Sequence, residues 1–237
     1  MSSQPGLPQD YIARIATLRG RRHVFATLDP ARTALVVVDM QNAFVAAGAP
    51  FEVAPARAIV PAINRVAAAL RAAGGRVVWV QATQGKKGTP EYFELFFENF
   101  LAPAARERAH AAVSEGHPFH ALYPELDVRV GDRIVKKCRP SAFIQGASDI
   151  EAYLRAQTID TVLIAGAATN VCCESTARDA AMLGFRLVVI EDANASHSDA
   201  EHVAGLMTVY RYFGDVRPAD EVIQLIAAGA EAARRAG

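Results

Sequence analysis

The stretch TVLIAGAATNVCCESTARDA, residues 161–180, passes from an apolar run through a short polar loop into a helical pattern. The run at 161–167 is apolar without alternation, which is typical of a strand buried on both faces of a parallel sheet. Residues 172–184 have the spacing of an amphipathic helix. A strand that leads directly into a helix predicts a βα unit, the repeating element of an open parallel sheet.

The same alternation extends along the chain in both directions. Strand patterns occupy 33–39 (TALVVVD), 76–82 (RVVWVQA), 132–137 (DRIVKK) and 186–192 (RLVVIED), and helical patterns occupy 55–75, 148–157, 199–213 and 218–236. Crossovers of this kind place helices on both faces of a sheet. The sequence therefore predicts a single-domain α/β fold over 31–237: a doubly wound, mainly parallel, Rossmann-like sheet in three layers. An N-terminal extension, 1–30, precedes it.

One segment, 84–131, is too long for a simple crossover. Its centre, EYFELFFENFL, contains five aromatic residues. Three interpretations are open: a helix packed on its own domain, a lid over a functional site, or a subunit interface, since exposed apolar patches tend to mark contacts.

Composition narrows the class of protein. The chain has 237 residues, with 25 Lys and Arg against 25 Asp and Glu. Zero net charge offers no basic surface to nucleic acid or to an anionic membrane and leaves little self-repulsion, so a homo-oligomer, dimer or tetramer, is expected. The N-terminus lacks the apolar core of a signal peptide, and no apolar run is long enough to span a bilayer. Three cysteines form no disulfide framework, which predicts a cytoplasmic protein with reduced thiols.

Ligands of open parallel sheets gather beyond the carboxyl ends of the strands. Asp39 ends the first strand pattern, Lys136 and Lys137 end the third, and a cysteine pair follows 161–167. Singly, each has a plainer explanation: a turn aspartate, a solvated lysine, a buried cysteine. Together they supply the base, the positive charge and the thiol that an activated thiolate requires.

The loop before the cysteines is expected to complete the site. Thr169 or Asn170 can cap the helix that starts near Cys172, leaving free N–H groups at its first turn. The helix N-terminus is expected to lower the pKa of a thiol placed there, and its N–H groups can hold an oxyanion.

The adjacent cysteines at 172 and 173 cannot both face the cleft, because successive helical residues point about 100° apart. One is expected to be the nucleophile and the other to pack in the core. A vicinal disulfide would need distorted geometry in a reducing compartment. A zinc site would need further ligands at short spacing, and the six histidines form no such motif; His117 and His120 are expected to be structural or pocket-lining.

Three blocks of the sequence resemble the isochorismatase-like cysteine hydrolases, a superfamily of amidases and related enzymes. They are VVVDMQNAF (36–44), KKCRPSAF (136–143) and GAATNVCCESTARDAAMLGF (166–185), and the resemblance runs from about residue 30 to 225. It implies that the catalytic aspartate, lysine and cysteine are Asp39, Lys137 and Cys172. Cys173 takes a place usually held by valine. The side chain of Lys136 should leave its strand on the opposite face from Lys137.

The resemblance also implies a cis peptide bond between Ala167 and Ala168. The N–H groups of Ala168 and Cys172 would then form the oxyanion hole. Nicotinamidases of this superfamily hold a metal through an Asp-x-His pair after the second strand, but here that strand is followed by ATQGKKG (82–88). Neither metal nor cofactor is therefore expected. Isochorismatases proper cleave a vinyl ether without a cysteine, so Cys172 argues against that chemistry.

The combination of DMQNAF, WVQ and TNVCxESTARD is most similar to the ureidoacrylate amidohydrolase branch, with N-carbamoyl amide hydrolases nearby. The resemblance implies a cysteine-dependent amidohydrolase that cleaves a small amide, ureido or N-carbamoyl substrate through a covalent acyl- or carbamoyl-cysteine. The alternatives are a non-catalytic binding relative of the same fold and an ester or lactam hydrolase using the same three residues.

Several side chains are candidates for the substrate pocket. Arg139 could bind a substrate carboxylate through two hydrogen bonds. Trp79 belongs either to the pocket wall or to the core. The remaining candidates for the wall are Phe44, Gln81 and Phe143.

Overall fold

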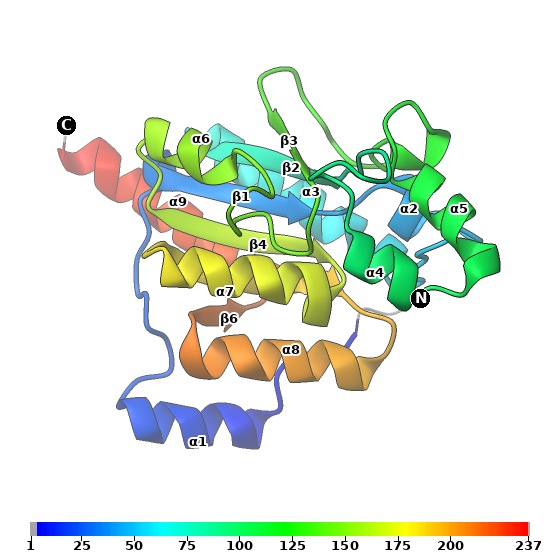
Figure 1. The fold of residues 1–237 in the computed structure, drawn as a ribbon. Helices are drawn as coiled ribbons and strands as arrows, with labels where there is room; N and C mark the ends of the chain where they lie inside the picture. Colours follow the sequence, from blue (N-terminus) through cyan, green and yellow to red (C-terminus); the bar gives the residue numbers. More distant parts are fainter. Residues whose placement is uncertain (1–3, 237) are drawn as a thin grey trace.

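The computed structural model describes residues 4–236 and contains one six-stranded sheet (Figure 1). All five strand pairings are parallel, in the order β3-β2-β1-β4-β5-β6. The strands are β1 (Thr33–Val38), β2 (Arg76–Ala82), β3 (Arg133–Lys137), β4 (Thr161–Ala167), β5 (Arg186–Ala195) and β6 (Asp215–Arg217). The predicted fold is confirmed, and five strands match the predicted ranges. No pattern predicted β6, because three residues are too few to show a period.

The chain enters the sheet at the inner strand β1 and runs from there first to one edge and later to the other. From β1 it runs to β2 and β3 on one side, then returns to β4 and continues to β5 and β6 on the other. Val38 at the end of β1 pairs with Val80 of β2 and with Gly166 of β4. The order reverses between β1 and β4, and a crevice for ligands forms beyond the strand ends at such a switch point.

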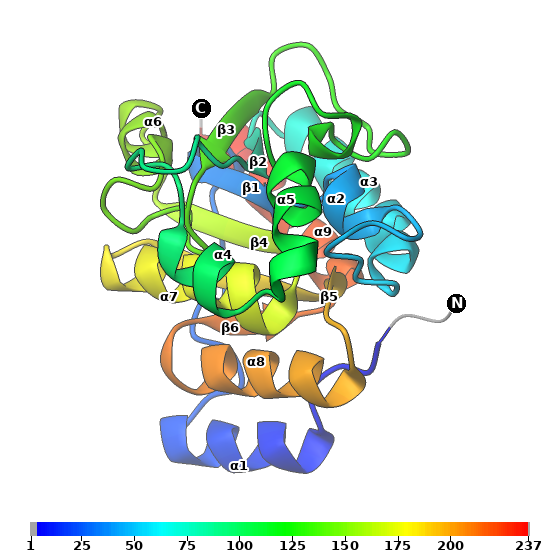
Figure 2. The ribbon, with the colours of Figure 1, turned by 45° about the vertical axis from the view of Figure 1, so that its right-hand side comes forward.

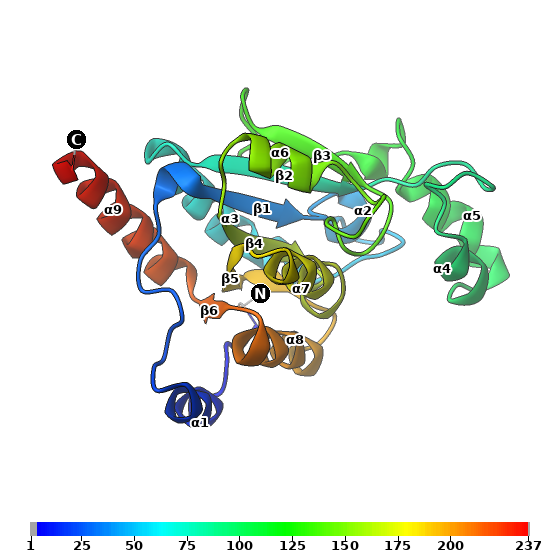
Figure 3. The same cartoon turned by 60° about the vertical axis from the view of Figure 1, so that its left-hand side comes forward.

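Helices cover both faces of the sheet because successive strand residues point to opposite sides. Leu35 and Val37 of β1 pack with α3 (Ala56–Ala72) and α9 (Ala219–Ala236). Val36 and Val38 pack on the other face with α6 (Ile150–Ala156), α7 (Glu174–Met182) and α8 (Asp199–Tyr212). Figure 3 shows the sheet between these two helical layers.

The predicted N-terminal extension contains a helix, α1 (Gln9–Arg19), that the sequence patterns did not indicate. It lies against the outer side of α8 (Figure 2). Tyr11 and Ile15 are buried there, and the Tyr11 hydroxyl donates a 2.9 Å hydrogen bond to the Met207 carbonyl. Residues 1–3 and 237, the outer ends of the two predicted ranges 1–30 and 31–237, lie outside the described residues.

The first part of the segment 84–131 projects beyond the carboxyl ends of the strands (Figures 2 and 3). It forms α4 (Glu94–Asn99) and α5 (Pro103–Ala112), which share a small apolar cluster with Ala43 of α2 (Asn42–Val45). Three short turns complete the secondary structure: η1 (Pro30–Arg32), η2 (Pro118–His120) and η3 (Thr169–Cys173). Within residues 4–236, no helix is both long and apolar enough to cross a bilayer.

Candidate active site

A buried ion pair lies at the carboxyl ends of β1 and β3. Lys137 Nζ is 2.8 Å from Asp39 Oδ2, and the two side chains are 2% and 0% exposed. Lys137 Nζ also donates a 3.1 Å hydrogen bond to the Arg139 carbonyl. Among the described residues, neither Asp39 oxygen accepts a hydrogen bond; Oδ2 is held by the Lys137 charge and Oδ1 has no partner. One carboxylate oxygen is thus held by the ammonium, and the other is free to accept a proton.

The strand period decides which lysine enters the site. β3 alternates between exposed and buried residues: Lys136 is exposed and Lys137 is buried. Lys136 points the other way and pairs with Glu115 at 2.8 Å. The sequence-based choice of opposite faces for the two lysines agrees with this geometry.

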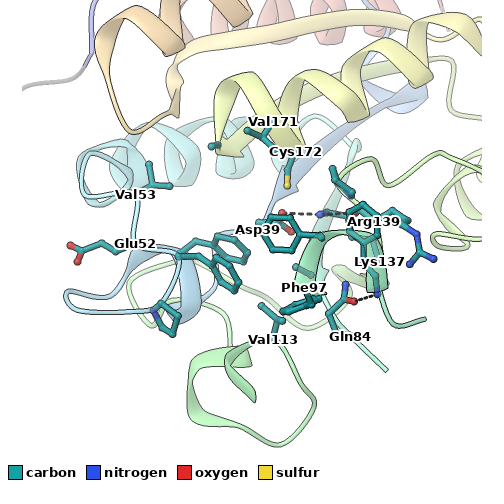
Figure 4. Close-up of a pocket in the computed structure, with 18 of the residues that line it drawn as sticks. Asp39, Glu52, Val53, Gln84, Phe97, Val113, Lys137, Arg139, Val171 and Cys172 are labelled. Carbon is teal, nitrogen blue, oxygen red and sulfur yellow. Dashed lines mark hydrogen bonds and ion pairs between the residues drawn. The ribbon is translucent and has the colours of Figure 1, made fainter. Parts of the chain in front are cut away.

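Cys172 lies in the π-helical turn η3, between β4 and α7. The residue as a whole is partly exposed, and Figure 4 shows the sulfur directed toward Asp39. Cys173 is 1% exposed and packs in the core under α7. The two neighbouring cysteines therefore separate as expected, one facing the cavity and one in the core.

The backbone at the end of β4, directly before η3, packs closely against β1. Gly166 has φ +126°, and a Cβ there would lie 2.1 Å from the Val38 carbonyl oxygen, so only glycine permits this approach of β4 to β1. The peptide bond between Ala167 and Ala168 is cis. Within residues 4–236, the Ala168 N–H donates no hydrogen bond, which leaves it available to a ligand in the cavity.

The predicted helix cap is wrong. α7 begins at Glu174, and no side chain caps it. Thr169 instead forms a 2.7 Å hydrogen bond with Nδ1 of His202, and Asn170 Oδ1 accepts a 2.5 Å hydrogen bond from Ser196. Both hydrogen bonds therefore connect η3 to residues in or just before α8. Neighbouring sequence positions do not reveal such contacts between distant parts of the chain.

The expected lowering of the thiol pKa is also wrong. Burial raises the pKa of Cys172 to about 12, and the Asp39 carboxylate adds to the rise, while Lys137 opposes it. Desolvation works to lower the pKa of Lys137, but Asp39 and Cys172 outweigh it and raise that pKa. The free site thus holds a neutral thiol beside an ion pair, and the thiol must lose its proton as it attacks.

We expect alkylation to reveal this protonation state. Iodoacetamide reacts with the thiolate, so the rate at Cys172 should rise about tenfold per pH unit from pH 7 to 9 without a plateau. Asp39→Asn removes the negative charge that raises the pKa, so alkylation at pH 8 should become faster while catalysis becomes slower. Intact-mass measurement follows the adduct, since Cys138 and Cys173 are buried. An alkylation rate that is already constant between pH 7 and 9 would contradict the neutral thiol.

His202 is a buried histidine of α8 that contacts Thr169 of η3, and its protonation state affects the stability of the fold. It is fully buried on α8, and Gly205 of the same helix is small enough for the backbone of Asn170 to approach. Burial lowers the pKa of His202 from 6.5 to about 4, and the Asp199 charge opposes this only in part. The imidazole is therefore neutral at pH 7 in the folded protein.

Acid should accordingly weaken the protein through His202. Between pH 6.5 and 4 the unfolded chain binds a proton that the folded imidazole does not. The free energy of unfolding should fall across this window by up to about 3 kcal/mol. His202→Asn removes the titrating group, and its urea-unfolding free energy should depend less on pH by that amount. Equal pH slopes for the two proteins would rule out this assignment.

A cavity of about 360 Å³ opens above the ion pair, within the size range of small-ligand sites. Asp39, Lys137, Ala168 and Cys172 line its base. Most of its wall is apolar and comes from α2, the loop after it, and the segment 84–131. Figure 4 shows Phe97 and Val113 across the cavity from Cys172.

The candidate pocket residues divide into two groups. Phe44 and Arg139 line the cavity. Gln81 and Phe143 are not among its lining residues: the Gln81 amide donates to the His120 carbonyl at 2.9 Å, and Phe143 packs against Phe185 on the α7 face.

Trp79 belongs to the core. It is fully buried and donates its indole N–H to Asp132 at 2.8 Å. His117 and His120 are likewise absent from the cavity wall, so neither is pocket-lining.

Sequence reasoning missed the aromatic wall and His197. Phe51, Phe93, Phe96 and Phe97 line the cavity, as does His197, which lies two residues after the end of β5. The aromatic density of EYFELFFENFL and the position of His197 behind a strand were the available signals. In the part of the chain that the structure describes, no three His, Cys, Asp or Glu side chains gather as a metal site requires.

Comparisons with known proteins found related sequences and related folds. A family model described as the isochorismatase domain matches residues 33–221. The ureidoacrylate amidohydrolase RutB of Klebsiella variicola (strain At-22) is 33% identical over 203 residues, which cover 79% of this chain and 84% of that protein. The crystal structure of a cysteine hydrolase from Pseudomonas syringae pv. phaseolicola 1448A has a TM-score of 0.78 and 28% identity, covering 87% of this chain and 98% of that one. The N-carbamoylsarcosine amidase of Thermoplasma acidophilum has a TM-score of 0.63 and 26% identity, covering 80% and 97%.

Proposed function

The chain belongs to the isochorismatase-domain family, and we propose that it is a cysteine-dependent amidohydrolase acting on a small amide, ureido or N-carbamoyl substrate. The observation that carries the proposal is the buried Asp39–Lys137 pair beneath the thiol of the partly exposed residue Cys172, inside a cavity of small-ligand size. Relatives named as a ureidoacrylate amidohydrolase and an N-carbamoylsarcosine amidase support the reaction class.

The proposed first step is attack by the Cys172 sulfur on the substrate carbonyl carbon. Because the thiol pKa is about 12, proton transfer accompanies attack: Asp39 takes the thiol proton as the C–S bond forms. The carbonyl electrons move to oxygen, and the N–H groups of Ala168 and Cys172 stabilise the oxyanion. Lys137 keeps the Asp39 carboxylate in place.

Collapse of the tetrahedral intermediate breaks the C–N bond. Asp39 returns the proton to the nitrogen, which leaves as ammonia or an amine. An amide leaves a thioester on Cys172, and a ureido group leaves a thiocarbamate. Water then gives a proton to Asp39 as it attacks the carbonyl carbon. The C–S bond breaks, the proton returns to sulfur, and a carboxylic or carbamic acid departs.

The test is product formation together with capture of the covalent intermediate. Primary amides, ureido acids and N-carbamoyl amino acids are assayed for ammonia release, and the esters with the matching acyl groups are assayed for acid release. Acid quench in the steady state should show the acyl or carbamoyl mass on the peptide that contains Cys172. Turnover of the ester alone would replace the amidase proposal by an esterase. Absence of turnover for every compound would favour a binding protein.

The finer predictions from the sequence belong to the same proposal. The protein is expected to act as a homo-oligomer in the cytoplasm, and the segment 84–131 to serve as a lid or an interface. Its residues Phe93, Phe96 and Phe97 line the cavity, which supports the lid.

A further inference from the structure

Aromatic rings form a continuous wall over one part of the cavity. Phe44 stacks on Phe51 at 5.5 Å between ring centroids, and Phe51 contacts Phe96 at 6.3 Å. Phe96 in turn contacts Phe93 at 6.0 Å and Phe97 at 5.4 Å. All five rings line the cavity. They come from two segments of the chain, α2 with its following loop and α4 with the residue before it.

The two cationic side chains that line the cavity, Lys137 and Arg139, both have partners within the protein. Lys137 pairs with Asp39 and donates to the Arg139 carbonyl. The Arg139 guanidinium donates to the carbonyls of Cys138 and Pro90 at 2.8 and 3.0 Å, and it lies 5.0 Å from the centre of the Phe93 ring. In Figure 4 it points away from Cys172.

The other ionisable groups of the wall do not replace these cations. Glu52 is negative, accepts hydrogen bonds from Gly48 and Arg57, and points away from Cys172 in Figure 4. His197 belongs to the exposed segment after β5, at the rim. A substrate carboxylate inside the aromatic part of the cavity would thus lose its water, while Lys137 is paired with Asp39 and the Arg139 guanidinium is held by two backbone carbonyls and points away from Cys172.

Building on the proposed amidohydrolase function, we infer that this site selects substrates whose group distal to the scissile bond is uncharged and apolar, an aromatic ring or a branched alkyl chain. Ureidoacrylate, named for the relatives, carries a carboxylate in that place. Burial of a ring against the phenylalanines is favourable, and the pairing of aromatic edges and faces adds to it. Burial of an unpaired carboxylate is unfavourable.

Two matched pairs of compounds test the inference. 3-Phenylpropanamide and succinamate share the CH2CH2CONH2 core and differ only in phenyl against carboxylate; 2-phenylethylurea and 3-ureidopropionate form the ureido pair. Ammonia release gives kcat/KM for each. We expect the phenyl compound to exceed its partner by roughly 100-fold or more, the ratio that burial of one ring and loss of one hydrated charge supports.

Phe96→Ala tests the wall itself. It should reduce kcat/KM for 3-phenylpropanamide about tenfold more than kcat/KM for succinamate, because only the phenyl group uses the lost surface. Leu95→Ala is the matched control: Leu95 is the adjacent residue of α4, is 63% exposed, and does not line the cavity. It should leave both values unchanged.

The inference fails independently of the proposed function. Equal values within a pair, or faster hydrolysis of the carboxylate compounds, would overturn the apolar preference while the amidohydrolase stands. If no compound is hydrolysed, the proposed function fails. Calorimetric titration of the wild-type protein with 3-phenylpropanamide and succinamate then decides the preference: tighter binding of the phenyl compound supports it, and equal or weaker binding overturns it.

Discussion

Replacement of Cys172 by alanine is expected to reduce kcat/KM for any hydrolysed amide by at least about 10⁴-fold, because the covalent intermediate cannot form. The fold should be little affected, since Cys172 is a small, partly exposed residue that lines the cavity. Steady-state ammonia release and thermal unfolding, measured on the same preparation, separate loss of chemistry from loss of structure.

Cys173→Ala is the matched control, one residue away on the same turn. Cys173 is 1% exposed in the core cluster, so its truncation should cost about 1 kcal/mol of stability and leave turnover within a few-fold of wild type. If Cys172→Ala retained activity and Cys173→Ala lost it, the nucleophile would be assigned to the wrong residue.

Lys137→Met is expected to be both inactive and unstable. It leaves the Asp39 carboxylate buried without its partner, which should cost 3–5 kcal/mol, roughly the penalty for breaking one member of a buried pair. The double variant Asp39→Asn/Lys137→Met replaces the pair by neutral groups and should regain most of that stability while staying inactive. Urea unfolding and ammonia release distinguish the two effects.

Lys136→Met provides the control for charge on the same strand. Lys136 is 53% exposed and pairs with Glu115 at the surface, where an ion pair contributes at most about 1 kcal/mol. Its removal should change neither activity nor stability appreciably. A Lys137→Met protein as stable as wild type would show that the buried pair is not a structural requirement, and an active one would remove Lys137 from the mechanism.

Much of the architecture was predictable because it depends on local patterns. Apolar runs without alternation predicted five of the strands, and helical spacing predicted α3 and α6 to α9, to within a few residues. Several elements were not predicted, among them β6 and α1. β6 has only three residues, and only two residues of α1, Tyr11 and Ile15, are buried. A short element or a narrow buried side does not produce a detectable period.

The sequence by itself determined which residues meet at the site. The family resemblance selected Asp39, Lys137 and Cys172. Parallel strands end at one edge, which predicted that an aspartate, a lysine and one of the two cysteines converge there, and the two-residue period of β3 placed Lys136 and Lys137 on opposite faces. Both rules operate within single strands and require no knowledge of distant contacts.

Only the tertiary structure decided the chemistry of the site around those residues. The thiol pKa is raised because burial and the Asp39 charge act together, and both depend on how separate strands pack. The aromatic wall joins residues of α2 and α4 that lie about fifty positions apart, and the Thr169–His202 contact joins two that are 33 apart. Such contacts form only when the chain folds back on itself, so a local pattern carries no record of them.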